Sequence, residues 1–382
     1  MEHIARPALR GLQRRHLIGA AAASLATGLP RTLLAAGAPI LVGQSVPLSG
    51  PLQGAFKGPL AGQQLALDEL NQAGGIGGRP IQLQLLDDAY DPKRTVENVR
   101  QLVERDKVVA LTGLGSTAGI GAVLPYLADQ RVPLVGAWSG AHVLRLKPHP
   151  CFFTSQGSFE DEVEKSLRTL VTLQLGEVGV AVQDNAFGQL ILPMLQAKAK
   201  ALGATLVGTA PLAVDGSNAA QAVAALAKAQ PKALMLIAVG PSVSAFVMAA
   251  KPTLKVPVYT LSVSASSVAP MGGAARGLAM TQIVPYPWRE VDPMAKAFNR
   301  LAAAANVPVD YSSYGGYLGG RFLIESLRRA SPNPTPEGII KAIEGIQNWS
   351  LGGNLLNFSP TRHHGSTWAE ITIVGPNGQF LR

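Results

Sequence analysis

The stretch KVVALTGLGSTAGIG, residues 107–121, joins an apolar run to a loop of glycines and hydroxyls. The run VVALT predicts a buried strand, and Ile120, Leu124 and Leu127 predict the apolar face of a following helix. Free backbone N–H groups and the helix dipole at Ser116 and Thr117, where that helix starts, favour an anionic group. Whether this strand–loop–helix segment belongs to a larger α/β fold, and which group its loop faces, follows from the rest of the sequence.

The same alternation of apolar strand and amphipathic helix runs along the chain from Ile40 onward, in two series. Strands are predicted at 40–46, 81–88, 108–112 and 132–136, and then at 178–182, 204–210, 233–239 and 256–261. Alternation at this spacing implies parallel strands with right-handed crossovers. The sequence therefore predicts an α/β protein with two doubly wound parallel-sheet lobes joined by a hinge.

The later segments divide between these lobes. The stretch YPW near Trp288 returns the chain to the first lobe, with helices at 293–305 and 313–329, and the tail forms a hairpin around Asn377-Gly378. We expect the first lobe to comprise residues 38–156 and 287–356. The second lobe comprises residues 157–286 and 357–382.

Residues 1–37 have the organisation of an export signal, with a basic start, an apolar stretch and a small-residue end. They contribute +4 of the formal charge of +9. Arg14-Arg15 resembles the twin-arginine export pattern, with general secretion as the alternative. Cleavage is expected after Ala36 or Gly37. The signal predicts export to the periplasm. The mature chain is expected to be soluble, because no later segment has 18 uninterrupted apolar residues.

The sequence lacks the residue patterns that nucleotide binding, nucleophilic catalysis and metal binding require. GLGSTA matches the glycine pattern of a dinucleotide-binding loop, but the acid that would bind the ribose about 20 residues later is missing. The sequence also lacks the P-loop motif that binds nucleotide phosphates and the nucleophile-elbow motif of hydrolases. His363 and His364 are expected to be solvated, Asp87 and Asp88 to form a turn or cap, and Cys151 to be buried. We predict no catalytic set, metal site or cofactor, and no nucleic-acid partner, because Lys and Arg do not cluster with aromatics.

In open parallel sheets, ligands bind outside the carboxyl ends of the strands, so the loops there carry the candidate site. Ser116 either caps its helix or meets a ligand, and Trp138 and Phe187 are either pocket wall or lobe packing. Ser139 offers a hydroxyl and Gly140 an unobstructed amide.

At these loops the chain resembles the branched-chain amino-acid type of periplasmic binding protein, the class I Venus-flytrap receptors of ABC transporters. The resemblance rests on VGQSVPLSGP, NQAGGIGGRPIQLQLLDD, VPLVGAWSGAHVL, DNAFG and GGAARGLAMTQIVPYPW, and covers essentially all of the mature chain. It implies a monomeric receptor whose lobes close on a small-molecule solute and which then docks on a permease in the inner membrane.

The resemblance also implies site residues. Ser116 or Thr117 matches the hydroxyl that meets the ligand carboxylate, and Trp138 and Ser139 match the groups around the amino-acid head. Gly140 stands where the family often has Thr, and Phe187 where it has Tyr. Ala55 or Phe56 is at the aromatic position of the first lobe, and Ser262 lies in a loop where the family often has an acid.

That acid is missing from both expected segments, which have the sequences TSQGSF and SVSASS. A buried ammonium without a carboxylate is costly. A carboxylate, an amide or an aromatic acid therefore fits as well as a branched-chain amino acid. The alternatives are an amide-sensing regulator of the same fold and a nucleotide-dependent enzyme.

Overall fold

The structure is a computed structural model that describes residues 37–50 and 52–382. The predicted export signal lies outside the described residues, apart from Gly37. The chain from Ala36 onward forms one compact unit that contains two separate large sheets.

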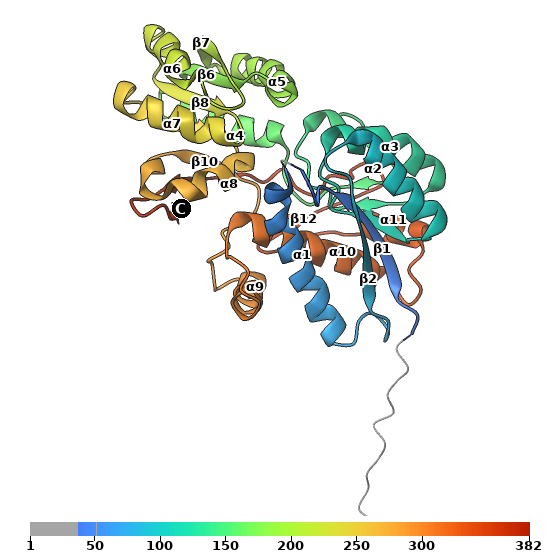
Figure 1. The fold of residues 1–382 in the computed structure, drawn as a ribbon. Coiled ribbons are helices and arrows are strands. Elements are labelled where there is room, and N and C mark those ends of the chain that lie inside the picture. The colour runs from blue at the N-terminus through green and yellow to red at the C-terminus, as the bar shows by residue number, and fades with distance from the viewer. Residues whose placement is uncertain (1–36, 51) are drawn as a thin grey trace, which may run out of the picture. The chain divides into compact units, whose positions relative to one another are not determined.

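The first sheet has five parallel strands in the order β2-β1-β3-β4-β5. Figure 1 shows its edge strand β2 beside β1. These strands are β1 (Ile40–Val46), β2 (Ile81–Asp87), β3 (Ala110–Thr112), β4 (Leu134–Val135) and β5 (Phe152–Phe153). Side chains alternate along a strand, so neighbours face opposite sides. Val135 and Phe153 pack in the core under α1 (Gln53–Gln72) and α10 (Tyr311–Arg329). Leu134 and Phe152 pack under α2 (Pro92–Arg100) and α3 (Thr117–Gln130). This alternation explains the helices on both faces.

The helices of this lobe come from both ends of the chain. They are α1 (Gln53–Gln72), α2 (Pro92–Arg100), its π-helical continuation η1 (Gln101–Arg105), α3 (Thr117–Gln130), the 3₁₀ turn η2 (His142–Arg145), α9 (Pro293–Ala304), α10 (Tyr311–Arg329) and α11 (Pro336–Glu344). A short hairpin of β11 (Trp349–Leu351) and β12 (Asn354–Leu356) follows α11.

Helices α1 and α10 touch at glycines. A Cβ on Gly62 would overlap the carbonyl oxygen of Ser313, and a Cβ on Gly316 would overlap that of Pro59. Only glycine permits so close an approach of two helix backbones. Both contacts lie near the amino-terminal half of α10, where the helix approaches the site described below.

The second sheet has seven strands in the order β14-β13-β10-β9-β8-β6-β7. Parallel pairs join β6 (Glu177–Gln183), β7 (Thr205–Leu212), β8 (Ala233–Ile237), β9 (Val258–Thr260) and β10 (Ala279–Gln282). The last two strands, β13 (Glu370–Val374) and β14 (Phe380–Leu381), are antiparallel and form the predicted terminal hairpin. The prediction of two doubly wound lobes is confirmed.

Helices also cover both faces of the second sheet (Figure 1). One face carries α4 (Phe159–Thr172) and α5 (Ala186–Leu202), and the other carries α6 (Ala219–Lys228) and α7 (Pro241–Thr253). Three short turns, η3 (Ser262–Ser264), α8 (Ala265–Val268) and η4 (Ala269–Ala275), follow β9.

The segments 154–158, 283–292 and 357–369 connect elements of the two lobes, and the first and third run side by side. The N–H of Thr154 donates to the carbonyl of His363 at 3.1 Å, and the N–H of Gly365 donates to the carbonyl of Thr154 at 2.8 Å. The expectation that His363 and His364 are solvated is wrong. His363 is 2% exposed with its ring 4.2 Å from that of Phe153, and burial lowers the pKa of His364 to about 3.

Candidate functional site

A cavity of about 240 Å³ is lined by residues of both lobes. Its walls include Phe56 of α1, the Trp138–Gly140 loop after β4, and Ser262 after β9. Gln282 at the end of β10 and Tyr311 at the start of α10 complete two further sides. The loops after β4, β9 and β10 meet here, so the cavity lies at the carboxyl ends of parallel strands, where such folds bind ligands.

A larger cavity, about 560 Å³, lies at the opposite edge of the first sheet. It is lined by Pro39 and Pro80, which directly precede β1 and β2, and by uncharged neighbours. It contains no ionisable side chain among the described residues and lies at the amino ends of its strands. The cavity between the lobes is therefore the candidate site.

One wall of this site is aromatic. The ring of Phe56 lies 6.3 Å from that of Trp138 in a stacked arrangement, and 6.3 Å from that of Tyr90. A Cβ on Gly115 would overlap the Phe56 ring, so the glycine loop after β3 packs directly behind this wall. Gly113, with a φ of +60°, is likewise pressed against the side-chain amide of Gln44. Close packing explains these two glycines.

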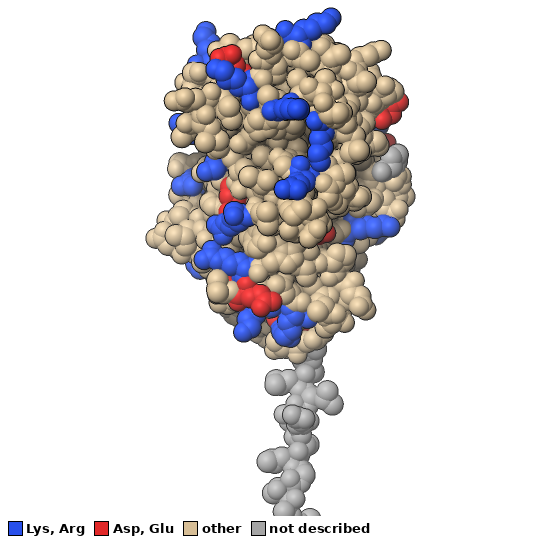
Figure 2. Space-filling view, turned by 90° about the vertical axis from the view of Figure 1, so that its left-hand side faces the viewer, with Lys and Arg blue, Asp and Glu red and all other residues tan. Residues whose placement is uncertain are grey.

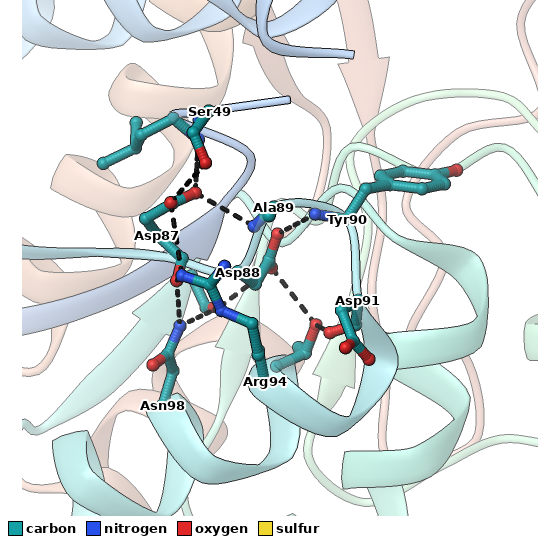
Figure 3. A network of polar contacts seen from close by, with 11 residues as sticks. Ser49, Asp87, Asp88, Ala89, Tyr90, Asp91, Arg94 and Asn98 are labelled. Atoms are coloured by element: carbon teal, nitrogen blue, oxygen red, sulfur yellow. Dashed lines mark hydrogen bonds and ion pairs between the residues drawn. The ribbon is translucent and has the colours of Figure 1, made fainter. Parts of the chain in front are cut away.

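The turn after β2 positions Tyr90 (Figure 3). The Asp87 and Asp88 carboxylates each accept a hydrogen bond, 2.9 Å long, from the backbone N–H two residues ahead. The expected turn role of this acidic pair is confirmed. The Ser49 hydroxyl also donates to Asp87, and this bond holds the pKa of the Asp87 carboxyl well below its usual range.

Ser116 and Thr117 lie behind the cavity rather than along it. The Ser116 hydroxyl accepts from the N–H of Gly119 at 3.1 Å and so caps α3, and the residue is 2% exposed. The Thr117 hydroxyl lies 2.8 Å from that of Ser139, which does line the cavity. Direct ligand contact by Ser116 or Thr117 stays a prediction.

Phe187 and Gly140 both lie against the ring of Phe159. The rings of Phe187 and Phe159 pack edge to face at 5.5 Å, and Phe159 lines the cavity. A Cβ on Gly140 would come within 2.9 Å of the Phe159 ring. The structure thus brings Phe56, Trp138, Ser139, Gly140 and Ser262 together around the cavity, whereas Phe187 supports its wall from behind.

Sequence reasoning missed Arg145 of η2, which lines the cavity. Its Nη1 donates to the carbonyl of Gln156 at 2.9 Å, and its Nη2 donates to the carbonyl of Ser139 at 3.1 Å. Burial lowers the pKa of Arg145 to about 10, so the guanidinium is charged at neutral pH. The sequence could have indicated Arg145 as a site residue, because it lies in the connection after β4, at the carboxyl end of a parallel strand.

Glu162 of α4 was also missed. It lies outside the two segments TSQGSF and SVSASS, which contain no acid, and it does not line the cavity, but it bonds to Ser262. The fully buried carboxylate accepts from the N–H of Ser262 at 2.7 Å, from the Ser262 hydroxyl at 2.8 Å, and from the Thr281 hydroxyl. Burial raises the pKa of Glu162 to about 7. Its place on the apolar stripe of α4, beside Phe159 and Val163, could have indicated its burial.

Two α/β lobes with a cavity at their strand ends define the class of two-lobed ligand-binding proteins. The family model described as periplasmic binding protein matches residues 39–379, and the chain belongs to this family. The resemblance inferred from the sequence is confirmed. The family consists of substrate-binding proteins rather than enzymes.

Relatives agree with this assignment. The chain is 28% identical over 208 residues to the "Leu/Ile/Val-binding protein homolog 8" of Brucella abortus (strain 2308), a match that covers 50% of this chain and 49% of the relative. The chain thus matches about half the length of that curated relative. A substrate-binding periplasmic protein from Ralstonia solanacearum has a similar structure, with 30% identity, a TM-score of 0.77, and coverage of 90% of this chain and 99% of the other.

A third likeness concerns the fold alone. A branched-chain amino acid ABC transporter structure from Thermus thermophilus with bound valine has 19% identity and a TM-score of 0.81, covering 90% of this chain and 94% of the other. Within the described residues, none of the helices combines the length and the apolar character needed to cross a membrane.

Proposed function

We propose that this protein is an extracytoplasmic receptor that captures a small polar or carboxylate-bearing solute between its lobes and delivers it to an ABC permease. The observation that carries the proposal is the cavity, because its walls are an aromatic pair, hydroxyls and one cation contributed by both lobes. Its volume of about 240 Å³ suits a small molecule rather than a macromolecular segment.

Closure follows from the same arrangement. A solute that touches Trp138 in one lobe and Ser262 in the other binds the closed form better, and therefore shifts the population toward it. The closed receptor would then present a different surface to the permease than the empty one.

We further propose export to the periplasm through residues 1–37 and action as a monomer. On the face shown in Figure 2, Lys and Arg side chains are spread out rather than gathered into one patch.

The test begins with protein purified from its native compartment, which is denatured so that any released small molecule can be identified by mass spectrometry. Adding that solute back at a hundredfold excess over its dissociation constant is expected to raise the free energy of unfolding by about 2.7 kcal/mol. Cells lacking the protein are expected to lose uptake of the same solute.

Two tryptophan variants localise the binding. Trp138→Ala is expected to weaken solute affinity at least about tenfold, because an aromatic wall is lost. Trp349→Ala removes a ring of the same size, packed on Phe322 outside the cavity lining, and is expected to leave affinity unchanged. Release of no solute, together with no stabilisation by any candidate, would refute the proposed function.

A further inference from the structure

Arg145 has donors to spare. Of the five N–H bonds of a guanidinium, two are used by the carbonyls of Gln156 and Ser139. The Nε is buried and has no hydrogen-bond partner among the described residues. Because Arg145 also lines the cavity, we take the N–H bonds that remain on Nη1 and Nη2 as the donors available to a solute there.

The nearby carboxylates are already occupied. Asp161 and Glu162 both influence the pKa of Arg145, so they lie within its electrostatic reach. Asp161, however, accepts from the N–H and the hydroxyl of Ser158, each at 2.7 Å. Glu162 accepts its three hydrogen bonds from Ser262 and Thr281. No ion pair joins either acid to Arg145 in the described part of the chain.

The cavity lining is correspondingly cationic. Among the described residues, its ionisable side chains are Arg145 and Tyr311, and no aspartate or glutamate lines it. Burial raises the pKa of Tyr311 above its usual range, so this hydroxyl stays neutral. A charged α-amine placed here would be near a cation and would have no carboxylate to receive it, which is costly in a buried site.

We propose that the solute is a small monocarboxylate without a charged amine, and that Arg145 holds its carboxylate. This inference rests on the proposed function and specifies its substrate class. The planar guanidinium fork matches a carboxylate and forms short, charge-assisted hydrogen bonds with it. The Phe56 and Trp138 rings supply an apolar wall for the body of the solute. Short branched or phenyl-substituted acids satisfy both requirements within the available volume.

Matched probes separate the carboxylate from the amine. Calorimetric titrations compare 4-methylpentanoate with leucine and 4-methylpentanamide, and 3-phenylpropanoate with phenylalanine and 3-phenylpropanamide. The protein is first unfolded, dialysed and refolded to remove bound solute. We expect one of the two carboxylates to bind at least about tenfold more tightly than its amino acid and its amide, because only the carboxylate pairs with Arg145 without adding a second cation.

Variants then assign the contact. Arg145→Gln is expected to weaken carboxylate binding by about ten- to a hundredfold and to weaken amide binding less, because only the carboxylate loses a charge-assisted bond. Arg145→Lys, which keeps the charge but loses the fork, is expected to give an intermediate loss of carboxylate binding. Arg321→Gln is the control, because Arg321 pairs with Glu69 at 3.0 Å and does not line the cavity. Should Arg145→Gln not fold, the Lys variant and the probe selectivity of the unaltered protein decide the question.

The outcomes distinguish the two proposals. Tighter binding of an amino acid or an amide than of its matched carboxylate overturns this inference and leaves the receptor function standing. If none of the six probes binds, the solute released from native protein decides: an amine-free carboxylate supports the inference, and any other solute overturns it. Release of no solute, with no probe bound, refutes both proposals.

Discussion

Replacing Glu162 by glutamine isolates the titration of one buried carboxyl. Burial raises the pKa of Glu162 to about 7 in the native protein, against an ordinary value of 4.5 for the unfolded chain. Its contribution to stability is therefore complete below pH 4.5 and is lost as the pH rises through 7. At 1.36 kcal/mol for each tenfold change in proton affinity, this loss amounts to about 3 kcal/mol.

Glutamine stays neutral, so the variant does not undergo this loss. The free energy of unfolding of Glu162→Gln minus that of the unaltered protein is expected to rise by about 3 kcal/mol between pH 4.5 and 8. Urea unfolding at a series of pH values measures it. The difference between the two proteins is measured because His364 also makes stability depend on pH. Burial lowers the pKa of His364, so its contribution to the free energy of unfolding falls as the pH falls below 6.5. This contribution is the same in both proteins and cancels in the difference.

Glu164→Gln is the matched control on α4. Ion pairing with Lys198 lowers the pKa of Glu164, so its contribution is present above pH 4.5 and is lost only in acid. This variant is expected to leave the dependence between pH 5 and 8 unchanged. The reasoning is refuted if Glu162→Gln follows the same pH dependence as the unaltered protein across that range.

Two further predictions concern packing and capping. Gly62→Ala is expected to cost about 1–3 kcal/mol of stability, because the new Cβ meets the backbone of α10. Gly54→Ala, in the same helix with no atom within 4 Å of the new Cβ, is expected to gain at most about 1 kcal/mol; equal urea midpoints for the two variants would contradict this account. Ser116→Ala is expected to cost about 1 kcal/mol of stability through loss of the α3 cap. An affinity loss like that of Trp138→Ala would confirm the predicted ligand contact of Ser116, and unchanged affinity would leave Ser116 as a cap alone.

Much of the fold could be predicted because the chain repeats one local pattern. Strand β1 is predicted at 40–46 from its own apolar residues and is observed over that range. The start of α2 is equally local, because the Asp91 side chain caps the helix and Pro92 lies in its first turn. Strand β5 has only the two residues Phe152 and Phe153, too few to show a period. The burial of His363 depends on a segment more than 200 residues away in the chain, which no local pattern encodes.

The site was predictable where strand topology alone places a loop. Trp138, Ser139 and Gly140 follow directly from a parallel strand, and the rule that ligands bind at carboxyl ends found them. Arg145 escaped because its direction is fixed by the carbonyl of Gln156, in the segment that leaves the first lobe. Glu162 escaped because a carboxylate on an otherwise apolar helix face gives no local sign of its partners.

The loop at residues 113–121 explains why a glycine pattern can mislead. Gly115 leaves room for the Phe56 ring, and the Ser116 hydroxyl is used by α3 itself. Thr117 reaches the cavity only through Ser139. The loop therefore acts on the solute by holding the aromatic wall and one hydroxyl in place, while the only cation in the described lining belongs to η2. The anion-binding role that the helix start suggests is thus assigned to Arg145, which lines the cavity and has no ion pair with a protein carboxylate among the described residues.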